Sequence, residues 1–450
     1  MPKPLWDKGE RVNERMRHLT VGDDPVLDLE LVPFDCRGSA AHARMLASIG
    51  VLNEDEADRL VSALAGIIEQ WAKGEFEIAP EEEDCHTAIE RELTRLVGDA
   101  GKKIHTGRSR NDQVLLAVRL YLRDRALRWQ DRLCSLAEAL LSRREELGTI
   151  PMPGYTHLQP AMPSSLGLWL HAFVEGCLDL VRQGFRLLDA LDECPLGSGA
   201  GFGVPLRLDR AMTARLLGFA RPQRSVVDVQ NSRGRHEGRF LAWACEIASL
   251  LEKFAWDVSL FLTREFGFLT LPVELTTGSS IMPQKRNPDL AELLRGRAAR
   301  VRGAAFELAV VTAKLPSNYH RDLQYTKEPL FRGVRETEAM MEMAELLVQG
   351  IQPDEDRLRA AMSEELYVTY QAYRLLREGM PFRDAYREAA RLAAQNATHV
   401  SDLRADFDII REQSELECVE AAAELGELKA ERQATASRLE RAERELMGGA

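Results

Sequence analysis

The sequence lacks the features that secreted, membrane-spanning and nucleic-acid-binding proteins require. Its seven cysteines are odd in number and widely spaced, with no Cys-x-x-Cys pair, which argues against a disulfide framework and against a zinc site. No run of about 18 apolar residues occurs, and the first residues contain no apolar core of the signal-peptide kind. A net charge of -12 gives no electrostatic reason to expect nucleic-acid binding. We therefore expect a cytoplasmic protein with reduced cysteines, no membrane span and no nucleic-acid partner.

Strand signals are also scarce, and helical periodicity dominates. Clusters of β-branched residues are short, and no Asn-Gly or Asp-Gly turn joins alternating runs. Apolar residues instead recur every three or four positions in the stretches 115–140, 166–188, 240–262 and 294–311. The stretch 166–188 belongs to a helix expected over residues 163–191 and is apolar on more than one face, as in a bundle core or a subunit interface. The sequence predicts an all-α fold built on a long central helical bundle.

Helix-breaking residues divide the chain into three predicted regions. An N-terminal helical domain covers residues 1–107, and a central long-helix domain covers 108–352. A C-terminal helical domain covers 353–450, where Pro381 marks a break between two helices. Its last part, residues 415–447, has the Ala-, Glu- and Arg-rich composition of a solvated helix.

Polar clusters interrupt the helical pattern at residues 83–86, 105–113, 153–160 and 277–288. Each is expected at a helix end, where free backbone donors bind anions well. In the second cluster, Arg108 and Arg110 offer guanidinium forks that match carboxylates. The alternative is a solvated helix cap with Asn111 or Asp112 as the capping residue.

The loop 277–288 combines several groups that could serve catalysis. Gly278 permits a positive φ, Ser279 supplies a hydroxyl and Lys285 a positive charge. Serine is a weak base unless cationic or backbone donors stabilise its alkoxide. These residues by themselves indicate a flexible anion-binding loop.

For His157 and for the segment 195–203, a purely structural role is an alternative to a functional one. His157 is a lone histidine, and such residues are more often structural than catalytic. The glycine-rich segment 195–203 lacks the strand–helix context and the glycine spacing of a phosphate-binding loop. We interpret it as a bend with close backbone packing, with ligand binding as the alternative.

Residues 278–288 resemble the signature of the fumarase/aspartase superfamily, whose members break a C–N or C–O bond beta to a carboxylate. Other clusters resemble the argininosuccinate lyase family within it, across residues 35–42, 105–114, 153–159, 195–199, 319–329 and 379–386. The resemblance implies reversible elimination of argininosuccinate to arginine and fumarate, the last step of arginine synthesis. It implies no metal and no cofactor.

The resemblance also implies roles for individual residues. Ser279 matches the general base, and Lys285 and Asn287 match the groups that stabilise the aci-carboxylate. His157 matches a histidine that pairs with a glutamate, here Glu292, and that acts as the general acid or supports it. The remaining matched positions contact substrate in the family: Ser39, Arg110, Asn111, Thr156, Tyr319, Gln324, Lys327 and Arg233.

The same resemblance implies a homotetramer with a core of about 20 helices, in which each site takes residues from three chains. Such sharing would explain polar clusters that lie far apart in the sequence. The chain departs from the common family pattern at Pro160, around Ser232 and beyond Val400.

Two alternatives stay open: a sibling lyase that releases fumarate from another N-succinyl amine, and a non-catalytic structural relative. Five residues favour argininosuccinate over another N-succinyl amine as the substrate: Arg108, Arg110, Tyr319, Gln324 and Lys327. The presence of Ser279, His157 and Lys285 argues against a non-catalytic relative.

Overall fold

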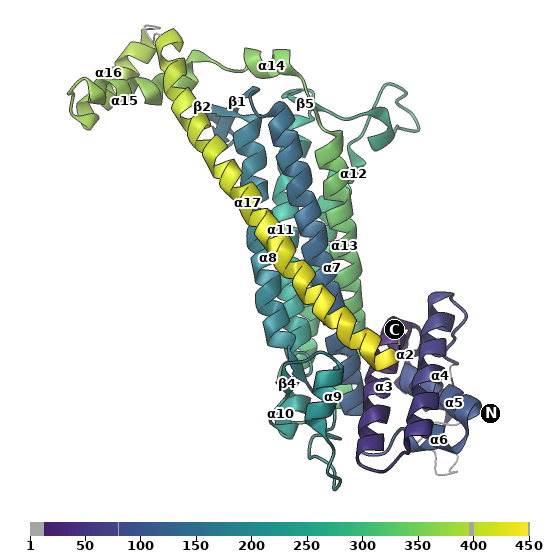
Figure 1. Ribbon diagram of the computed structural model, residues 1–450. Helices are drawn as coiled ribbons and strands as arrows, with labels where there is room; N and C mark the ends of the chain where they lie inside the picture. Colours follow the sequence, from purple (N-terminus) through teal and green to yellow (C-terminus); the bar gives the residue numbers. More distant parts are fainter. Residues whose placement is uncertain (1–12, 80, 396–399, 449–450) are drawn as a thin grey trace.

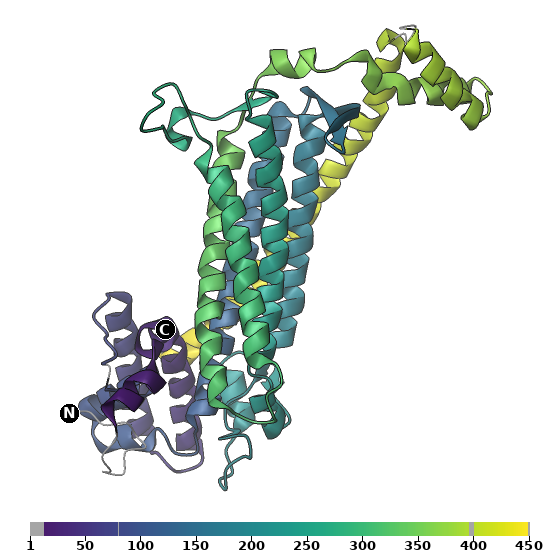
Figure 2. The same cartoon turned by 180° about the vertical axis from the view of Figure 1, so that it is seen from behind.

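The computed structural model describes residues 13–79, 81–395 and 400–448. Across these residues the chain is helical apart from short two-stranded sheets, which confirms the predicted all-α class (Figure 1). The long helices run along one axis, a group of short helices lies beside one end of them, and a helical pair projects from the other end (Figures 1 and 2).

The central bundle consists of long helices that alternate in direction: α7 (Arg110–Leu147), α8 (Leu166–Leu191), α11 (Arg235–Phe261), α12 (Asp289–Thr312) and α13 (Lys327–Gly350). The stripe predicted for α7 faces the core, since its leucines, valine and Trp129 are buried. Trp129 packs against Phe240 and Trp243 of α11, with ring centroids 4.6 and 5.2 Å away. Burial of this periodic apolar surface is the main stabilisation of the bundle.

A β-hairpin that the sequence did not predict lies between α7 and α8. Strand β1 (Pro151–Thr156) pairs antiparallel with β2 (Gln159–Ser165). The residues of the turn, His157 and Leu158, both have positive φ, 55° and 58°. Two consecutive residues in the left-handed region suit a two-residue hairpin turn, but Asn-Gly or Gly-Gly normally occupies these positions. The sequence signal that usually predicts such a turn is therefore absent here. We call this end of the bundle the hairpin end.

The N-terminal region packs beside the opposite end of the bundle. Its main helices are α3 (Val32–Ser48), α4 (Glu54–Ala72), α5 (Cys85–Val97) and α6 (Asp99–Lys103). They follow the short segments α1 (Glu14–Val21), α2 (Asp24–Leu27) and η1 (Asp28–Leu31). Helix α3 packs on α7, and its face toward α7 and α4 is buried. We call this end of the bundle the α3 end.

The short elements between the long helices cluster at the two bundle ends. At the α3 end lie β3 (Glu193–Cys194), α9 (Arg210–Leu216), β4 (Arg221–Pro222), α10 (Val226–Asn231) and η3 (Arg321–Thr326). At the hairpin end lie β5 (Leu269–Thr270), η2 (Val273–Leu275), β6 (Gln352–Pro353) and α14 (Glu355–Ala360).

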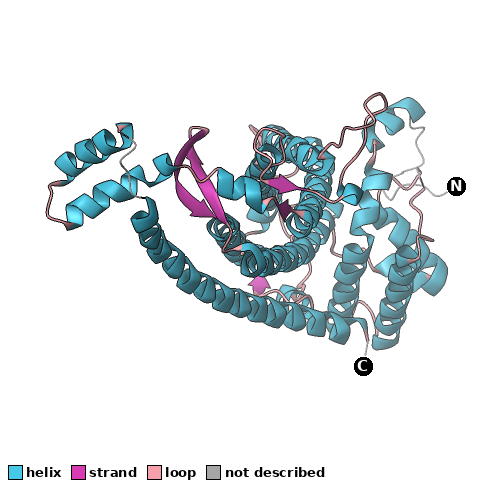
Figure 3. Cartoon of the chain, turned by 90° about the horizontal axis from the view of Figure 1, so that it is seen from above, coloured by secondary structure: helices cyan, strands magenta, loops and turns pink. Residues whose placement is uncertain are grey.

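The C-terminal region forms a projecting helical pair and one very long helix. After η4 (Glu364–Tyr367), α15 (Val368–Arg377) and α16 (Phe382–Ala394) form the pair, with the predicted break at Pro381. Helix α17 (Val400–Met447) then runs back along the outside of the bundle to the α3 end (Figures 1 and 3).

Helix α17 confirms the predicted tail helix but is not solvated on every side. Cys418, Ala421, Leu425 and Leu428 are buried, and the helix packs on α7 and α8. Their spacing of three and four residues forms an apolar stripe that the charged composition conceals.

No described helix combines the length and the apolar character that crossing a membrane demands. All seven cysteines are free thiols.

Candidate functional site

A cavity of about 220 Å³ lies at the α3 end, where α1, α2, α7, η3, α13 and the turn before α11 meet. Most of the predicted substrate-contact residues line it: Arg110, Asn111, Arg233, Tyr319, Gln324 and Lys327. The other lining residues are Val21, Asp24, Glu83, Asp84, Val114 and Arg321. We call it the Lys327 cavity. It brings residues more than 300 positions apart in the sequence to one place.

Lys327 is buried in the wall of this cavity between two aspartates. Its Nζ lies 2.6 Å from Oδ1 of Asp28 and 3.2 Å from Oδ2 of Asp24. Burial disfavours the ammonium, but the two carboxylates outweigh burial and raise the pKa of Lys327. Burial raises the pKa of Asp24 to about 6, against the opposing effect of Lys327. Asp28 is fully buried, whereas Asp24 borders the cavity.

We expect Lys327→Met to lower the free energy of unfolding by about 3–5 kcal/mol, because it leaves the buried Asp28 without its counter-charge. Adding Asp28→Asn to this variant should restore part of the loss. The matched control is Lys102→Met, which removes an exposed pair with Asp99 and should change stability by less than about 1 kcal/mol. Urea unfolding measures all three, and equal effects of Lys327→Met and Lys102→Met would contradict the network.

Arg110, the first residue of α7, is held in place by α5 and the segment before it. Its Nη1 lies 3.0 Å from Oδ2 of Asp84, and its Nη2 donates to Oγ1 of Thr87 at 2.6 Å. Asp84 also caps α5 by accepting from the backbone N–H of Thr87. Burial works to raise the pKa of Asp84, but His86, Arg110 and Thr87 lower it overall. The guanidinium therefore has a fixed position at the cavity.

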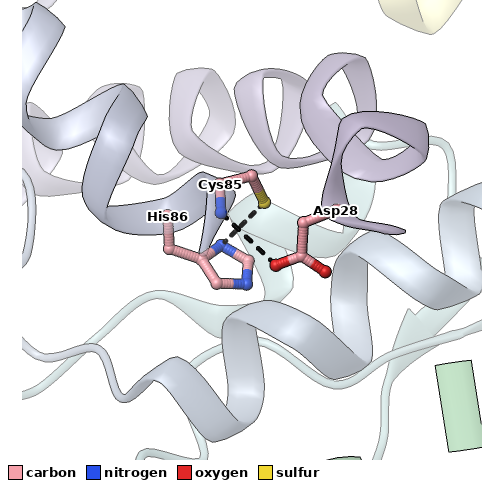
Figure 4. A group of neighbouring side chains, drawn as sticks. All are labelled: Asp28, Cys85 and His86. Atoms are coloured by element: carbon pink, nitrogen blue, oxygen red, sulfur yellow. Dashed lines mark hydrogen bonds between the residues drawn. The ribbon is translucent and has the colours of Figure 1, made fainter. Parts of the chain in front are cut away.

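Behind the cavity, Asp28, Cys85 and His86 place three possible metal-ligand atoms within 4.8 Å of one another (Figure 4). The donor chemistry does not suit a metal ion. Both Asp28 oxygens are engaged, one by Lys327 and the other by the backbone N–H of Cys85 at 3.3 Å. Burial raises the pKa of the Cys85 thiol well above its usual value. The cluster is better explained as a hydrogen-bonded support for the cavity wall.

His86 extends this support toward α3. Its Nδ1 lies 3.8 Å from Sγ of Cys85 (Figure 4). The same nitrogen lies 3.1 Å from Oδ2 of Asp35. Burial opposes the imidazolium, but Asp35, Asp84 and Asp28 outweigh burial and raise the pKa of His86. The buried acidic groups behind the cavity are thus balanced by His86 and Lys327.

Asp112 joins the start of α7 to the glycine-rich segment. Its Oδ1 accepts from the backbone N–H of Ser109, and its Oδ2 accepts from those of Gly197 and Gly199 at 3.0 and 2.8 Å. Ser109 caps α7 in return. The two bonds from Gly197 and Gly199 confirm the close packing predicted for residues 195–203. The capping alternative for residues 105–113 named the wrong residue, because Ser109 is the N-cap of α7 and the buried Asp112 completes the capping box from the third helical position. Arg110 faces the cavity.

We expect Asp112→Asn to lower the free energy of unfolding by about 1–3 kcal/mol, because the amide NH2 must face a backbone N–H. Burial raises the pKa of Asp112 from 3.8 to about 6. This raised pKa reduces wild-type stability as the pH rises through that interval, and asparagine does not titrate. The difference in Tm between the two proteins should therefore shrink from pH 4 to pH 6.

The control for this comparison is Asp209→Asn at the exposed cap of α9, where asparagine caps equally well. Its Tm difference from wild type should be small. If the Tm difference between wild type and Asp112→Asn stays constant from pH 4 to pH 6, the titration of Asp112 in this interval is contradicted.

Ser39 is not on the cavity wall. It is buried in α3, and its Oγ accepts from Nη1 of Arg108 at 2.8 Å. In this structure the serine fixes Arg108, and the residues that border the cavity from the N-terminal region are Val21, Asp24, Glu83 and Asp84. The suggested substrate contact of Ser39 finds no support in this arrangement.

The signature loop lies at the hairpin end, between η2 and α12. Thr277 and Asn287 pair through their backbones, so the loop has a closed base. Within it, Oγ of Ser279 accepts from the backbone N–H groups of Met282 at 3.2 Å and Ile281 at 3.4 Å. Nδ2 of Asn287 donates to the carbonyl of Gly278. Backbone donors thus point at the serine oxygen, which is the arrangement that stabilises an alkoxide.

The remaining predicted site residues also lie at the hairpin end and are exposed. Thr156 and His157 are at the tip of the hairpin, Lys285 is on the loop, and Glu292 is in the first turn of α12. Among the described residues of one chain, no hydrogen bond or ion pair joins His157 to Glu292. The expected pairing is therefore not formed within a single chain.

The two groups of predicted residues lie at opposite ends of the bundle. Helix α7 connects them, with Arg110 at one end and the hairpin four residues beyond Leu147 at the other. Its 38 residues at about 1.5 Å per residue span roughly 57 Å. A substrate cannot bridge this distance, so no single chain assembles the whole predicted site.

Sequence reasoning missed several residues of the Lys327 cavity. Glu83 and Asp84 belong to a polar cluster that the sequence singled out, but no role was assigned to them. Asp24, Asp28 and Arg321 gave no separate signal, because single charged residues are common in a chain with 71 acidic and 59 basic side chains. The Pro25 that follows Asp24 is the one local hint, since it marks a helix start.

Known proteins match this chain over most of its length. A family model described as "Lyase" matches residues 13–303. The argininosuccinate lyase of Sorangium cellulosum is 47% identical over 87% of this chain and 91% of its own length. That of Thermotoga neapolitana is 40% identical over 87% of this chain and 98% of its own length.

Solved structures support the fold. EDDS lyase in complex with formate has a TM-score of 0.81 at 22% identity, covering 98% of this chain and 96% of that one. A class II fumarase from Schistosoma mansoni has a TM-score of 0.70 at 16% identity, covering 87% of this chain and 91% of that one. The chain therefore belongs to the argininosuccinate lyase family of the fumarase/aspartase superfamily.

Proposed function

We propose that this chain, a carbon–nitrogen lyase by family, converts argininosuccinate reversibly to arginine and fumarate. The observation that carries the proposal is the identity of 40–47% to argininosuccinate lyases over most of the chain, together with the loop 277–288, which resembles the superfamily signature. The reaction breaks the bond between the succinyl carbon and a guanidinium nitrogen, and it removes a proton from the neighbouring carbon.

The signature loop supplies the groups for proton removal. Ser279 acts as the base, and the N–H groups of Ile281 and Met282 stabilise its alkoxide. Lys285 and Asn287 lie on the same loop and stabilise the extra negative charge of the aci-carboxylate. His157 and Glu292 act together at the leaving nitrogen, with the histidine as the acid or as the support of the acid.

The Lys327 cavity supplies substrate-binding groups of both signs. Arg110 and Arg233 suit carboxylates, Asn111 and Gln324 suit polar groups, and Asp24 borders the cavity as a carboxylate. A substrate that carries carboxylates, an ammonium and a guanidinium is complementary to such a lining.

A complete site needs the hairpin end of one chain beside the α3 end of another, and the family resemblance implies that three chains contribute to each site. We propose a homotetramer in which the central bundles pack together. Large apolar side chains exposed on the bundle support this assembly, among them Trp256 of α11 and Leu293 and Phe306 of α12.

The free thiols are in keeping with a cytoplasmic location.

The test is direct. Purified protein is mixed with argininosuccinate, and fumarate is followed by its ultraviolet absorbance. Fumarate release from argininosuccinate supports the proposal. Fumarate from another N-succinyl amine, with none from argininosuccinate, would establish the sibling-lyase alternative, and no fumarate from any such substrate would indicate a non-catalytic relative.

A further inference from the structure

A second cavity, of about 290 Å³, lies on the outer side of the α3 end, where the last turns of α17 cross α3, α7 and α9. Its apolar lining residues are Leu120, Leu127, Leu216, Leu217, Ala436, Leu439 and Leu446. Its charged lining residues are Arg37, Arg123, Arg128, Arg432, Asp124, Glu440 and Glu443. We call it the Arg123 cavity. None of these residues lines the Lys327 cavity or belongs to the signature loop.

The charges around this cavity do not balance. Arg37 pairs with Glu443 at 2.7 Å, and Arg128 pairs with Asp124 at 2.9 Å. Within the lining, these pairs leave the guanidinium groups of Arg123 and Arg432 and the carboxylate of Glu440, and Arg432 in turn pairs with Asp131, which lies outside the lining. The lining itself therefore has one more guanidinium group than carboxylates.

Arg123 is the most buried of the four arginines, with 8% of its surface exposed. Its Nη2 donates to the carbonyl of Leu217 at 2.8 Å, and its guanidinium lies over the Phe219 ring at 4.1 Å. Its Nε and Nη1 have no hydrogen-bond partner within the described part of the chain. Burial lowers the pKa of Arg123 to about 10, so the charged form is disfavoured where it stands. A nearby anion would relieve that penalty.

Arg432 lies closer to solvent and can bind an anion by a small exchange of partners. Its Nη1 lies 3.2 Å from Oδ1 of Asp131, whose side chain is 57% exposed. An ion pair this exposed stabilises little, so a ligand carboxylate can replace it at small cost.

We propose that the Arg123 cavity binds a small monocarboxylate with an apolar body. The carboxylate pairs with Arg432 and offsets the charge of Arg123, while the leucine side chains cover the apolar part. A bare inorganic anion would leave the leucine surface unfilled, and a neutral apolar molecule would leave the buried guanidinium of Arg123 without an added counter-charge. The volume is near the lower end of the roughly 300–1,000 Å³ typical of small-molecule sites, so the ligand is small. Its binding links the end of α17 to α3, α7 and α9.

Thermal unfolding of the full chain tests this proposal with three probes: hexanoate, its neutral amide hexanamide, and inorganic phosphate. We expect hexanoate to raise Tm in a concentration-dependent way, and the other two to have little effect. An equal effect of hexanamide, an effect of phosphate alone, or no effect of hexanoate would each overturn the proposal. This comparison uses only the wild-type protein.

Two variants place the bound carboxylate. Arg432→Gln should weaken the apparent affinity for hexanoate roughly tenfold, as expected for loss of a charge-assisted hydrogen bond. Leu439→Trp fills the cavity from α17 and should abolish the Tm shift. Arg441→Gln, on the same helix but outside the lining, is the matched control and should respond as wild type does. A hexanoate shift that persists unchanged in both cavity variants would place the ligand elsewhere and overturn the proposal.

Discussion

Ser279→Ala should lower kcat by roughly a thousandfold or more while substrate binding changes little. The alkoxide of Ser279 acts only in the transition state, so its removal costs transition-state stabilisation and leaves ground-state contacts in place. The backbone donors of Ile281 and Met282 that face its oxygen have no other role in the loop that the structure describes. Fumarate release measures kcat, and calorimetric titration of argininosuccinate into the variant measures binding.

Ser280→Ala is the matched control, because it removes the neighbouring hydroxyl from the same loop. Its kcat should stay within about threefold of wild type, since the backbone donors lie at Ser279. Turnover in Ser279→Ala within the same range would show that the base lies elsewhere. Equal large losses in both variants would indicate that the loop conformation, and not one hydroxyl, limits the reaction.

The central bundle was predictable because its burial is periodic. Each of the helices α7, α11 and α12 buries one apolar face against the other helices of the bundle. Apolar residues on one face of a helix recur about every 3.6 residues, so this burial is visible in the sequence. The start of α8 was predicted at Pro163 but lies at Leu166, because Ser165 caps the helix and residues 163–165 belong to β2.

The hairpin and the packing of α17 were not predictable by the same rules. The turn at His157 and Leu158 uses left-handed backbone conformations without glycine or asparagine, so local sequence does not announce it. In α17 charged residues surround the narrow buried stripe in the sequence. Its apolar face is identified only by the contact of the helix with α7 and α8.

The resemblance named part of the residues at the candidate site, and local sequence patterns did not predict which bundle end each of them reaches. The resemblance to a family named Arg110, Tyr319 and Lys327, and these gather at one cavity. Helical periodicity does not predict at which end of the bundle a polar cluster lies. That position depends on how many long helices precede the cluster in the chain. Asp28 shows the same limit, since its importance comes from burial beside Lys327 and not from any local pattern.

The separation of the two residue groups leads to the second large effect. Ser279→Ala is defective at the hairpin end, and Asn111→Leu is defective at the α3 end. Within the described residues, the side chain of Asn111 makes no hydrogen bond and its backbone N–H donates to Oγ of Ser109. Each variant alone should be nearly inactive. If each site joins the hairpin end of one chain to the α3 end of another, a mixture contains some sites with both ends intact.

Unfolding the two variants together in equal amounts and refolding them should therefore restore activity to about a quarter of wild type, because each intact end occurs with a probability of one half. The control mixture is Ser279→Ala with Lys285→Ala. Both changes lie on the same loop, so no chain contributes an intact loop and no activity should return. If the Ser279→Ala and Asn111→Leu mixture instead stays at the mean of the separate variants, both ends of a site must come from one chain. That outcome is difficult to reconcile with a helix of 38 residues between them, so the mixing experiment tests the assembly and the assignment of both residue groups at once.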